Sequence, residues 1–197
     1  MSGTAPPRLS FSVRPAAHGD VPAVVAAVQE LLRELGGTPP PTDAMRDAAR
    51  VLLDTPLAGA LLVAEADGAT VGAQADGGAA GVEANGGAHG AAADSGAAGA
   101  ETSLAVIGVL GVSWQTAIHA AGPYVLIQDL WVHPDWRGRG VGGGLLEALY
   151  ALAHEREITR AEVGLPPARF AGLPATEAFY RDQGFAPLGA RMRRVLP

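Results

Sequence analysis

The feature that most constrains this chain is a strand-like run that leads through a glycine-rich loop into a helix. The run from Tyr124 to Val132 is mostly apolar, and apolar residues recur at helical spacing from Val141 to about Arg156. Glycines stand at positions 138, 140 and 142 of this stretch, beside two arginines. Glycines at a helix N-terminus let backbone N–H groups approach an anion, so the loop predicts a site for a phosphate-bearing ligand.

Two common nucleotide motifs fit this loop poorly. A P-loop is excluded, because no Gly-x-x-x-x-Gly-Lys-Ser/Thr pattern occurs. The dinucleotide fingerprint matches formally at Gly138, Gly140 and Gly143, but residues 133–137 separate its first glycine from the strand. Its acidic partner would be Glu162, which falls inside the next predicted strand rather than at its end. A plain solvated loop that caps a helix does not explain why glycine recurs so regularly.

The overall composition sets further bounds. With 197 residues the chain suits one domain with a full hydrophobic core. A formal net charge of −6 argues against general nucleic-acid binding, and the absence of cysteine excludes a disulfide scaffold, a thiolate metal site and a cysteine nucleophile. No uncharged apolar stretch approaches the roughly 20 residues that span a bilayer. We expect a soluble, cytoplasmic protein without membrane contact, and a disordered leader over residues 1–8.

The periodicity along the chain predicts an α+β (mixed α/β) class. Asp20 is expected to cap the first helix, Thr42 or Asp43 the second, and Gly184 to end the last. A turn is expected at residues 121–123, so that its flanking strands pair as a hairpin. Strands are predicted over 9–14, 60–64, 104–118, 124–132, 161–165, near 185 and over 191–196, and helices over 21–35, 42–53, 141–156 and 175–183.

A segment of low complexity interrupts the first half of the chain. From about residue 68 to 102, alanine, glycine and aspartate dominate, and bulky apolar side chains are almost lacking. Such a composition buries too little apolar surface to offset the entropy of ordering. We therefore predict a disordered insertion inside the 9–197 domain, and we expect that deleting residues 70–100 leaves folding intact.

Two motifs about forty residues apart carry a family resemblance. Arg137, Gly140 and Gly142 fit the pattern Arg/Gln-x-x-Gly-x-Gly/Ala, and residues 178–185 read Ala-Phe-Tyr-Arg-Asp-Gln-Gly-Phe. Both resemble the GNAT superfamily of acetyl-CoA-dependent N-acetyltransferases, as does the first strand and helix entry at residues 13–20. The resemblance covers nearly the whole chain outside the leader and the insertion. It implies a GNAT-type fold, with a central, largely antiparallel twisted sheet flanked by helices.

The resemblance also implies where acetyl-CoA, the co-substrate, binds. The pyrophosphate is expected on the backbone of the glycine loop, with the loop arginines adding positive charge. The pantetheine arm is expected along the strand edge that follows Asp129, and the backbone N–H near Leu130 is expected to polarise the thioester carbonyl. The implied cofactor-binding residues are Leu130, Trp131, Val132, Arg137, Gly138, Arg139, Gly140, Val141 and Gly142.

Several polar side chains are candidates for the chemistry. Tyr180 matches the family's usual proton donor to the leaving thiolate. Many family members carry a glutamate where this chain has Gln128, which cannot take a proton, so Asp129 is the nearest carboxylate for a base or an ammonium anchor. A structural role for Asp129 is equally compatible with its place in a strand. Strand alternation is expected to separate these two neighbours. His119 is a second candidate base, and His133 is expected to make a loop contact.

The acceptor side is less defined by the sequence. Trp114, Gln115, Tyr124 and Trp131 either pack against the sheet or wall an acceptor pocket together with Gln128. No metal site is expected, because His154-Glu155 lacks the second histidine of His-Glu-x-x-His.

The predicted function is transfer of acetyl from acetyl-CoA to a primary amine of a small molecule or peptide by direct attack. A non-catalytic acyl-CoA sensor is the alternative, and a homodimer is left open because dimers are common in such folds.

Overall fold

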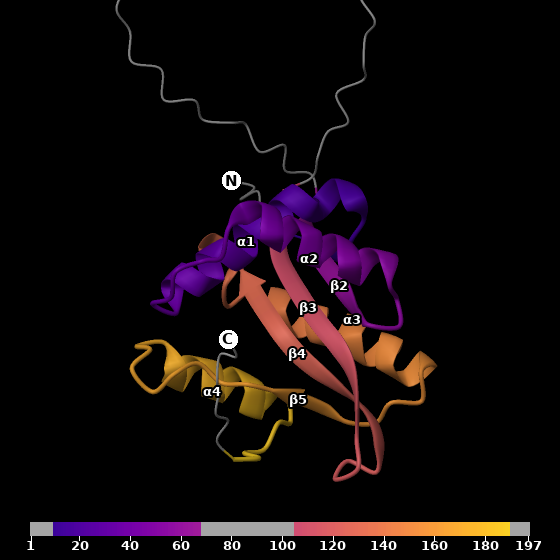
Figure 1. Ribbon diagram of the computed structural model, residues 1–197. Helices are drawn as coiled ribbons and strands as arrows, with labels where there is room; N and C mark the ends of the chain where they lie inside the picture. Colours follow the sequence, from indigo (N-terminus) through magenta and orange to yellow (C-terminus); the bar gives the residue numbers. More distant parts are fainter. Residues whose placement is uncertain (1–9, 68–104, 190–197) are drawn as a thin grey trace, which may run out of the picture.

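The computed structural model describes residues 10–67 and 105–189, and its centre is a twisted five-stranded sheet (Figure 1). The strands lie side by side in chain order, and within residues 10–67 and 105–189 the only parallel pair is β4 and β5. The strands are β1 (Phe11–Pro15), β2 (Gly59–Ala66), β3 (Val106–Ala117), β4 (Gly122–Val132) and β5 (Ala161–Val163). The predicted mixed, largely antiparallel class is confirmed. A dinucleotide-binding protein needs a doubly wound parallel sheet, so that alternative is excluded.

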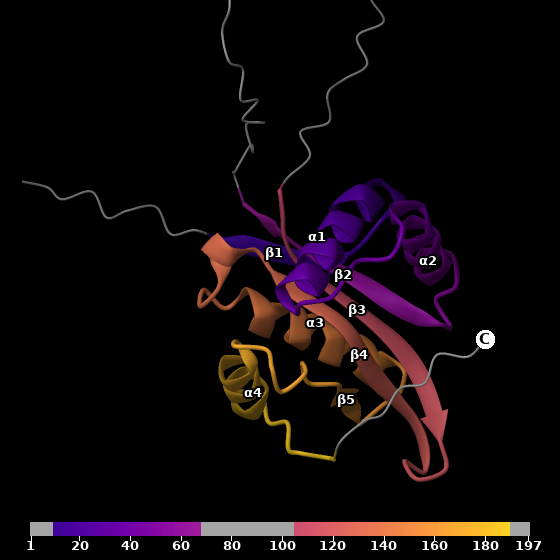
Figure 2. The same cartoon turned by 60° about the vertical axis from the view of Figure 1, so that its left-hand side comes forward.

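Helices cover both faces of the sheet (Figure 2). α1 (Val21–Glu34) and α2 (Thr42–Asp54) lie on one face, and α3 (Val141–Glu155) lies on the other. α4 (Leu173–Asp182) follows β5 and packs beside α3. Short 3₁₀ turns, η1 (His18–Asp20) and η2 (Pro134–Trp136), precede α1 and α3.

The core consists of two apolar layers, one on each face of the sheet. The layer beneath α3 is the larger and includes Leu62, Leu110, Val125, Ile127, Leu145, Leu146 and Leu149, all at most 3% exposed. The layer beneath α1 and α2 includes Val21, Val24, Val25, Leu61, Val63, Val109 and Trp131. Side chains of one strand alternate between these layers, so membership of a layer tells which face a strand residue occupies.

The entry to α1 differs from the prediction. Asp20 precedes the helix, but its side chain caps no α1 N–H group. Its carboxylate instead accepts hydrogen bonds from the Arg14 guanidinium at 2.7 and 2.9 Å and from the Ala17 N–H. Arg14 also bonds Glu65 of β2, and its guanidinium holds the pKa of Asp20 below the usual value. The aspartate thus ties the helix entry to β1 and β2. At α2 neither Thr42 nor Asp43 is the cap, since the helix begins at Thr42 after Pro41.

Two more boundaries differ from the prediction. The β3–β4 turn occupies residues 118–121, and β4 already begins at Gly122, two residues earlier than expected. Phe185 does not belong to a strand. It follows the C-terminal cap of α4, where the Gly184 N–H bonds the Arg181 carbonyl and the Phe185 N–H bonds the Tyr180 carbonyl, each at 2.9 Å. Gly184 therefore ends the helix as predicted.

Three predictions concern residues outside the described ranges: the leader at 1–8, the insertion at 68–102 and the closing strand at 191–196. Within the described part of the chain, no helix is long and apolar enough to cross a bilayer.

Candidate active site

The sheet opens where β4 and β5 part. β5 pairs with β4 only over Val125–Ile127, and beyond these residues β4 has no strand on that side within the ranges that the structure describes. The His133 N–H bonds the Ile107 carbonyl of β3 at 2.8 Å. Peptide groups alternate in direction along a strand, so the N–H groups of Leu130 and Val132 point away from β3, into the gap. One edge of the gap therefore offers unpaired backbone donors.

The glycine loop follows directly from the end of β4. After η2, Gly138 and Gly140 adopt φ values of 72° and 85°. These left-handed values favour glycine, and a Cβ at either position would meet no atom within 4 Å. No side chain caps the start of α3, so its first N–H groups stay available beside the loop. The loop is an open backbone cradle with the positive end of the α3 dipole behind it.

Gly142 has a different role from the two loop glycines. A Cβ on this residue would lie 3.1 Å from the Phe179 ring of α4. The missing side chain therefore allows α4 to pack on the first turn of α3. This contact fixes α4, which carries Tyr180 as its next residue, against the start of α3.

The two arginines of the loop differ in their surroundings. The Arg137 guanidinium donates to both carboxylate oxygens of Glu34, at 2.7 and 2.8 Å, and its Nε donates to the Val132 carbonyl at 3.0 Å. Arg137 thus joins the end of α1 to the end of β4, and sequence reasoning missed this partner because Glu34 lies a hundred residues away. Arg139 is exposed, lies over the Trp136 ring at 5.8 Å from its centroid, and forms no ion pair with another residue that the structure describes. Arg139 is the arginine with its charge free for an anion.

Gln128 forms a β-bulge in β4. Gly111 of β3 faces Asp129, but the next residue pair skips Gln128. The Gln128 amide donates to Ser113 Oγ at 3.0 Å, and a Cβ on Gly111 would lie 3.4 Å from an Asp129 oxygen. Gly111 and Ser113 share the α1/α2 face of β3, so Gln128 and Asp129 both lie on that face. The prediction that strand alternation separates them is wrong, because the bulge interrupts the alternation.

Asp129 is a largely buried carboxylate. Burial raises its pKa above the usual value, and no cationic side chain of the described residues pairs with it. A carboxylate with a raised pKa is a stronger base than an exposed one. Its neighbour in the chain is Leu130, whose N–H points into the gap. Asp129 therefore lies one residue from the place where a bound carbonyl would meet a backbone donor.

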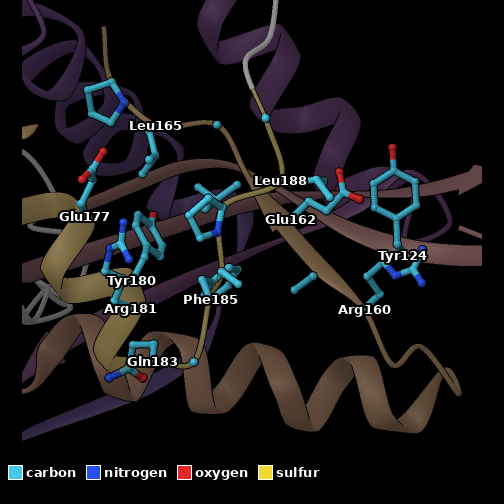
Figure 3. A pocket seen from close by; sticks show the side chains of 18 of the residues that line it. Tyr124, Arg160, Glu162, Leu165, Glu177, Tyr180, Arg181, Gln183, Phe185 and Leu188 are labelled. Carbon is cyan, nitrogen blue, oxygen red and sulfur yellow. The ribbon is translucent and has the colours of Figure 1, made fainter. Parts of the chain in front are cut away.

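Tyr180 projects from α4 toward β5 (Figure 3). Its ring packs between Phe179 and Phe185, with centroids 5.1 and 5.3 Å away, and the residue is only 7% exposed. Burial, with a smaller effect from Tyr150, raises the pKa of Tyr180 to about 12. Among the described residues its hydroxyl makes no hydrogen bond with the protein. The phenol is thus neutral and its proton is uncommitted.

His119 and Tyr124 lie together, with ring centroids 6.2 Å apart, and line the same cavity as Tyr180, whereas Trp114 lies apart from them. His119 lies in the β3–β4 turn, at the start of β4. At the usual rise per residue of a strand, Leu130 lies about 26 Å further along β4, so His119 is remote from the gap. Trp114 packs in the layer beneath α3, where Arg156 lies over its ring. Tyr124 precedes Val125, a member of that same layer, and therefore faces the opposite side. Trp114 and Tyr124 cannot wall one pocket.

Trp131 and His133 have structural surroundings. Trp131 is 5% exposed in the layer beneath α1 and α2, so only its backbone borders the gap. Its indole N–H is buried with no hydrogen-bond partner in the described structure. The His133 ring packs edge-on against it, and His133 Nδ1 accepts a hydrogen bond from the Asp135 N–H.

A cavity of about 1130 Å³ lies between β5, α4 and residues 185–189 (Figure 3). Tyr124, Glu162, Tyr180 and Leu188 are among its lining residues. It borders Gly189, where the described part of the chain ends, so we assign no ligand to it. Among the described residues, no three histidine, aspartate or glutamate side chains form a metal-binding group.

A gap beside β4, a glycine loop at the start of α3 and a tyrosine on α4 are the features that the two sequence motifs contribute to the structure. The acetyltransferase (GNAT) domain family matches residues 58–187, more than half of the chain. The chain therefore belongs to the GNAT acetyltransferase family. No curated protein sequence matches it.

Solved structures of low sequence identity share the fold. One is an aminoglycoside N-acetyltransferase, AAC(6')-Iy, in complex with CoA, with a TM-score of 0.66, 14% identity and coverage of 98% of this chain and 99% of that one. A predicted acetyltransferase with acetyl-CoA from Clostridium acetobutylicum has a TM-score of 0.64 and 14% identity, with coverage of 94% of this chain and 96% of that one. A glucosamine-6-phosphate N-acetyltransferase from Arabidopsis thaliana has a TM-score of 0.60 and 12% identity, with coverage of 95% of this chain and 99% of that one.

Proposed function

We propose that this protein transfers an acetyl group from acetyl-CoA to a primary amine of a small molecule or peptide. The observation that carries the proposal is the edge of β4 that no described strand pairs, which leads through the short turn η2 into the glycine cradle of α3. A molecule with a pyrophosphate at one end and an amide-rich arm at the other requires both features in this order. The family of the chain and the solved acetyl-CoA and CoA complexes of the same fold support this ligand.

The cradle and the strand edge would hold different parts of acetyl-CoA. The pyrophosphate would accept hydrogen bonds from the backbone of residues 137–142, and the exposed Arg139 would add positive charge. The pantetheine amides would pair with the free peptide groups of Leu130 and Val132, as an added strand does. Arg137 would act by holding the loop against α1 and β4 through Glu34, rather than by direct contact with phosphate.

The proposed reaction is a direct attack of the amine on the thioester. The amine nitrogen forms a bond to the carbonyl carbon, and the Leu130 N–H stabilises the negative charge that develops on the carbonyl oxygen. Asp129 takes the proton that makes an ammonium substrate a neutral nucleophile. The carbon–sulfur bond then breaks as the sulfur receives a proton from the general acid. The nitrogen of the new amide gives up its second proton, which restores the general acid, and amide and thiol are the products. The chain has no cysteine that could form an acyl-enzyme thioester.

Tyr180 is proposed as the general acid at the leaving sulfur. A phenol with a pKa of about 12 keeps its proton throughout the physiological range, so it is always in the donor form. Its hydroxyl has no competing protein acceptor within the described residues. The α4–α3 contact at Gly142 keeps this donor beside the end of β4.

Amine-dependent CoA release tests the proposal. The enzyme would be mixed with acetyl-CoA and a panel of amino sugars, polyamines, amino acids and peptides, and free thiol would be measured with a chromogenic reagent. At least one amine should raise the rate of CoA release far above hydrolysis. Saturable acetyl-CoA binding with no amine-dependent release across the panel would favour the acyl-CoA sensor instead.

A further inference from the structure

A strip of polar side chains extends from Asp129 along the α1/α2 face of β3 and β4. Ser113 lies at its centre, and its Oγ accepts hydrogen bonds from the Gln115 and Gln128 side-chain amides, both at 3.0 Å. Asp129 lies beside Gly111, two residues before Ser113 on β3. We define the acceptor strip as Ser113, Gln115, Gln128 and Asp129.

The hydrogen bonds within the acceptor strip fix which atoms remain free. Each amide donates one of its two N–H groups to Ser113 Oγ, so each keeps its carbonyl oxygen and a second N–H group outside that bond. The strip therefore presents both acceptors and donors, and the Asp129 carboxylate is its one group that can carry a charge. A negative charge at that end of the strip favours an ammonium or hydroxyl group at the two amide oxygens and disfavours a carboxylate or phosphate there.

The length of the strip sets a second condition. Ser113 is two residues along β3 from Gly111, which faces Asp129, and a strand advances about 7 Å over two residues. A four-carbon chain between two functional groups spans a similar length. An amine beside Asp129 would thus place a group at its other end near Ser113 and the two amide oxygens. Gln128 is exposed, and Ser113 and Gln115 are half-buried, so this end of the strip is accessible.

We propose that the acceptor carries a second hydrogen-bond donor, an ammonium or hydroxyl group, about four carbons from the reacting amine, and carries no anionic group at that place. This inference rests on the proposed function and narrows its substrate class to diamines and polyhydroxylated amines. Gln115 and Gln128 then act as specificity residues through their carbonyl oxygens. The replacement of a glutamate by Gln128 thereby becomes part of substrate recognition.

Three acceptors of equal length test the inference: 1,4-diaminobutane, 1-aminopentane and 4-aminobutanoate. They differ only in whether the far end is a donor, an apolar methyl or a carboxylate. The value of kcat/KM should be about tenfold higher for the diamine than for the monoamine, as the loss of one charge-assisted hydrogen bond predicts, and lowest for the carboxylate. Equal values, or a preference for 4-aminobutanoate, would overturn the inference.

Variants separate recognition from chemistry. Gln128→Leu and Gln115→Leu remove a carbonyl oxygen each, and each should reduce the ratio of kcat/KM for the diamine to kcat/KM for the monoamine. Thr116→Val is the matched control, because Thr116 lies on β3 next to Gln115 but on the opposite face. A control variant that changes the preference as much as the two glutamine variants would contradict the assignment.

A binding measurement keeps the test independent of turnover. The side-chain NH₂ resonances of Gln115 and Gln128 should shift on titration with 1,4-diaminobutane in the presence of CoA, and much less with 4-aminobutanoate. If these shifts occur but no amine is acetylated, the proposed function fails and the recognition stands. If amines are acetylated but neither resonance responds to the diamine, the recognition fails and the proposed function stands.

Discussion

Replacing Tyr180 by phenylalanine removes one oxygen atom and separates a catalytic role from a structural one. The ring keeps its contacts with Phe179 and Phe185, and the hydroxyl makes no hydrogen bond within the described part of the protein. No buried partner is left unsatisfied by the change. The free energy of unfolding should therefore change by less than about 1 kcal/mol.

The effect on the reaction should be much larger. General acid catalysis contributes about 10² to 10⁴ in rate, which corresponds to roughly 3–5 kcal/mol of transition-state stabilisation. We expect kcat of Tyr180→Phe to fall in that range, with the KM for acetyl-CoA nearly unchanged. The assay is CoA release with a thiol reagent, which reads only the product because the protein has no cysteine.

Tyr150→Phe is the matched control. Tyr150 is a neighbouring tyrosine on α3 that is 37% exposed, and the same oxygen is removed. Its kcat should stay within about threefold of the unmodified enzyme, since it has no proposed part in proton transfer. If Tyr180→Phe keeps full activity, or if it loses activity only together with stability, the assignment of Tyr180 as the general acid is wrong.

Three further predictions concern the base, the anion cradle and the sheet. Burial raises the pKa of Asp129, so the folded state binds this proton more tightly than the unfolded state and loses stability as pH rises through that pKa. Asp129→Asn should therefore raise Tm at pH 7 in thermal melts, while it lowers kcat and removes the acidic limb of the pH–rate profile. An unchanged pH–rate profile would contradict the role of Asp129 as base. Arg139→Glu should raise the Kd for CoA, measured by calorimetry, about tenfold. Arg50→Glu on α2 makes the same change in charge and should leave this Kd unchanged. Equal effects of the two variants would show that net charge, and not a contact of Arg139 with the anion, determines binding. Gly59→Ala would place a Cβ onto the Val112 carbonyl, so the free energy of unfolding, measured with urea, should fall by more than about 2 kcal/mol. An unchanged free energy of unfolding would refute the close packing of β2 on β3.

The sequence predicts those parts of the fold that depend on local periodicity and on two short motifs. Apolar spacing is enough to locate α1 and α3, because one buried stripe determines each helix. The glycine cradle is also predictable, since positive φ at Gly138 and Gly140 is a local demand on residue type. The family resemblance adds the order and pairing of the strands, which periodicity alone does not contain.

The features that the sequence does not reveal depend on contacts between distant residues. The bulge at Gln128 arises from the register of β3 against β4, and no local pattern marks it. Its consequence, Gln128 and Asp129 on one face, changes the chemistry available to an acceptor. The Arg137–Glu34 pair and the Gly142–Phe179 contact likewise join segments far apart in the chain. For the same reason Trp114 and Tyr124, near in sequence, lie on opposite faces.

The central claim is acetyl transfer from thioester to amine, and a carbon label tests it most directly. The enzyme would be incubated with acetyl-CoA labelled with ¹³C at the carbonyl and with 1,4-diaminobutane, and the carbonyl resonance would be followed by NMR. The sequence contains no lysine, so side-chain amines of the enzyme cannot accept the label. The account predicts that the thioester signal is replaced by an amide signal in amounts equal to the CoA released. A signal that remains at the thioester, or appears only as acetate, with this and every other primary amine tested would contradict the account.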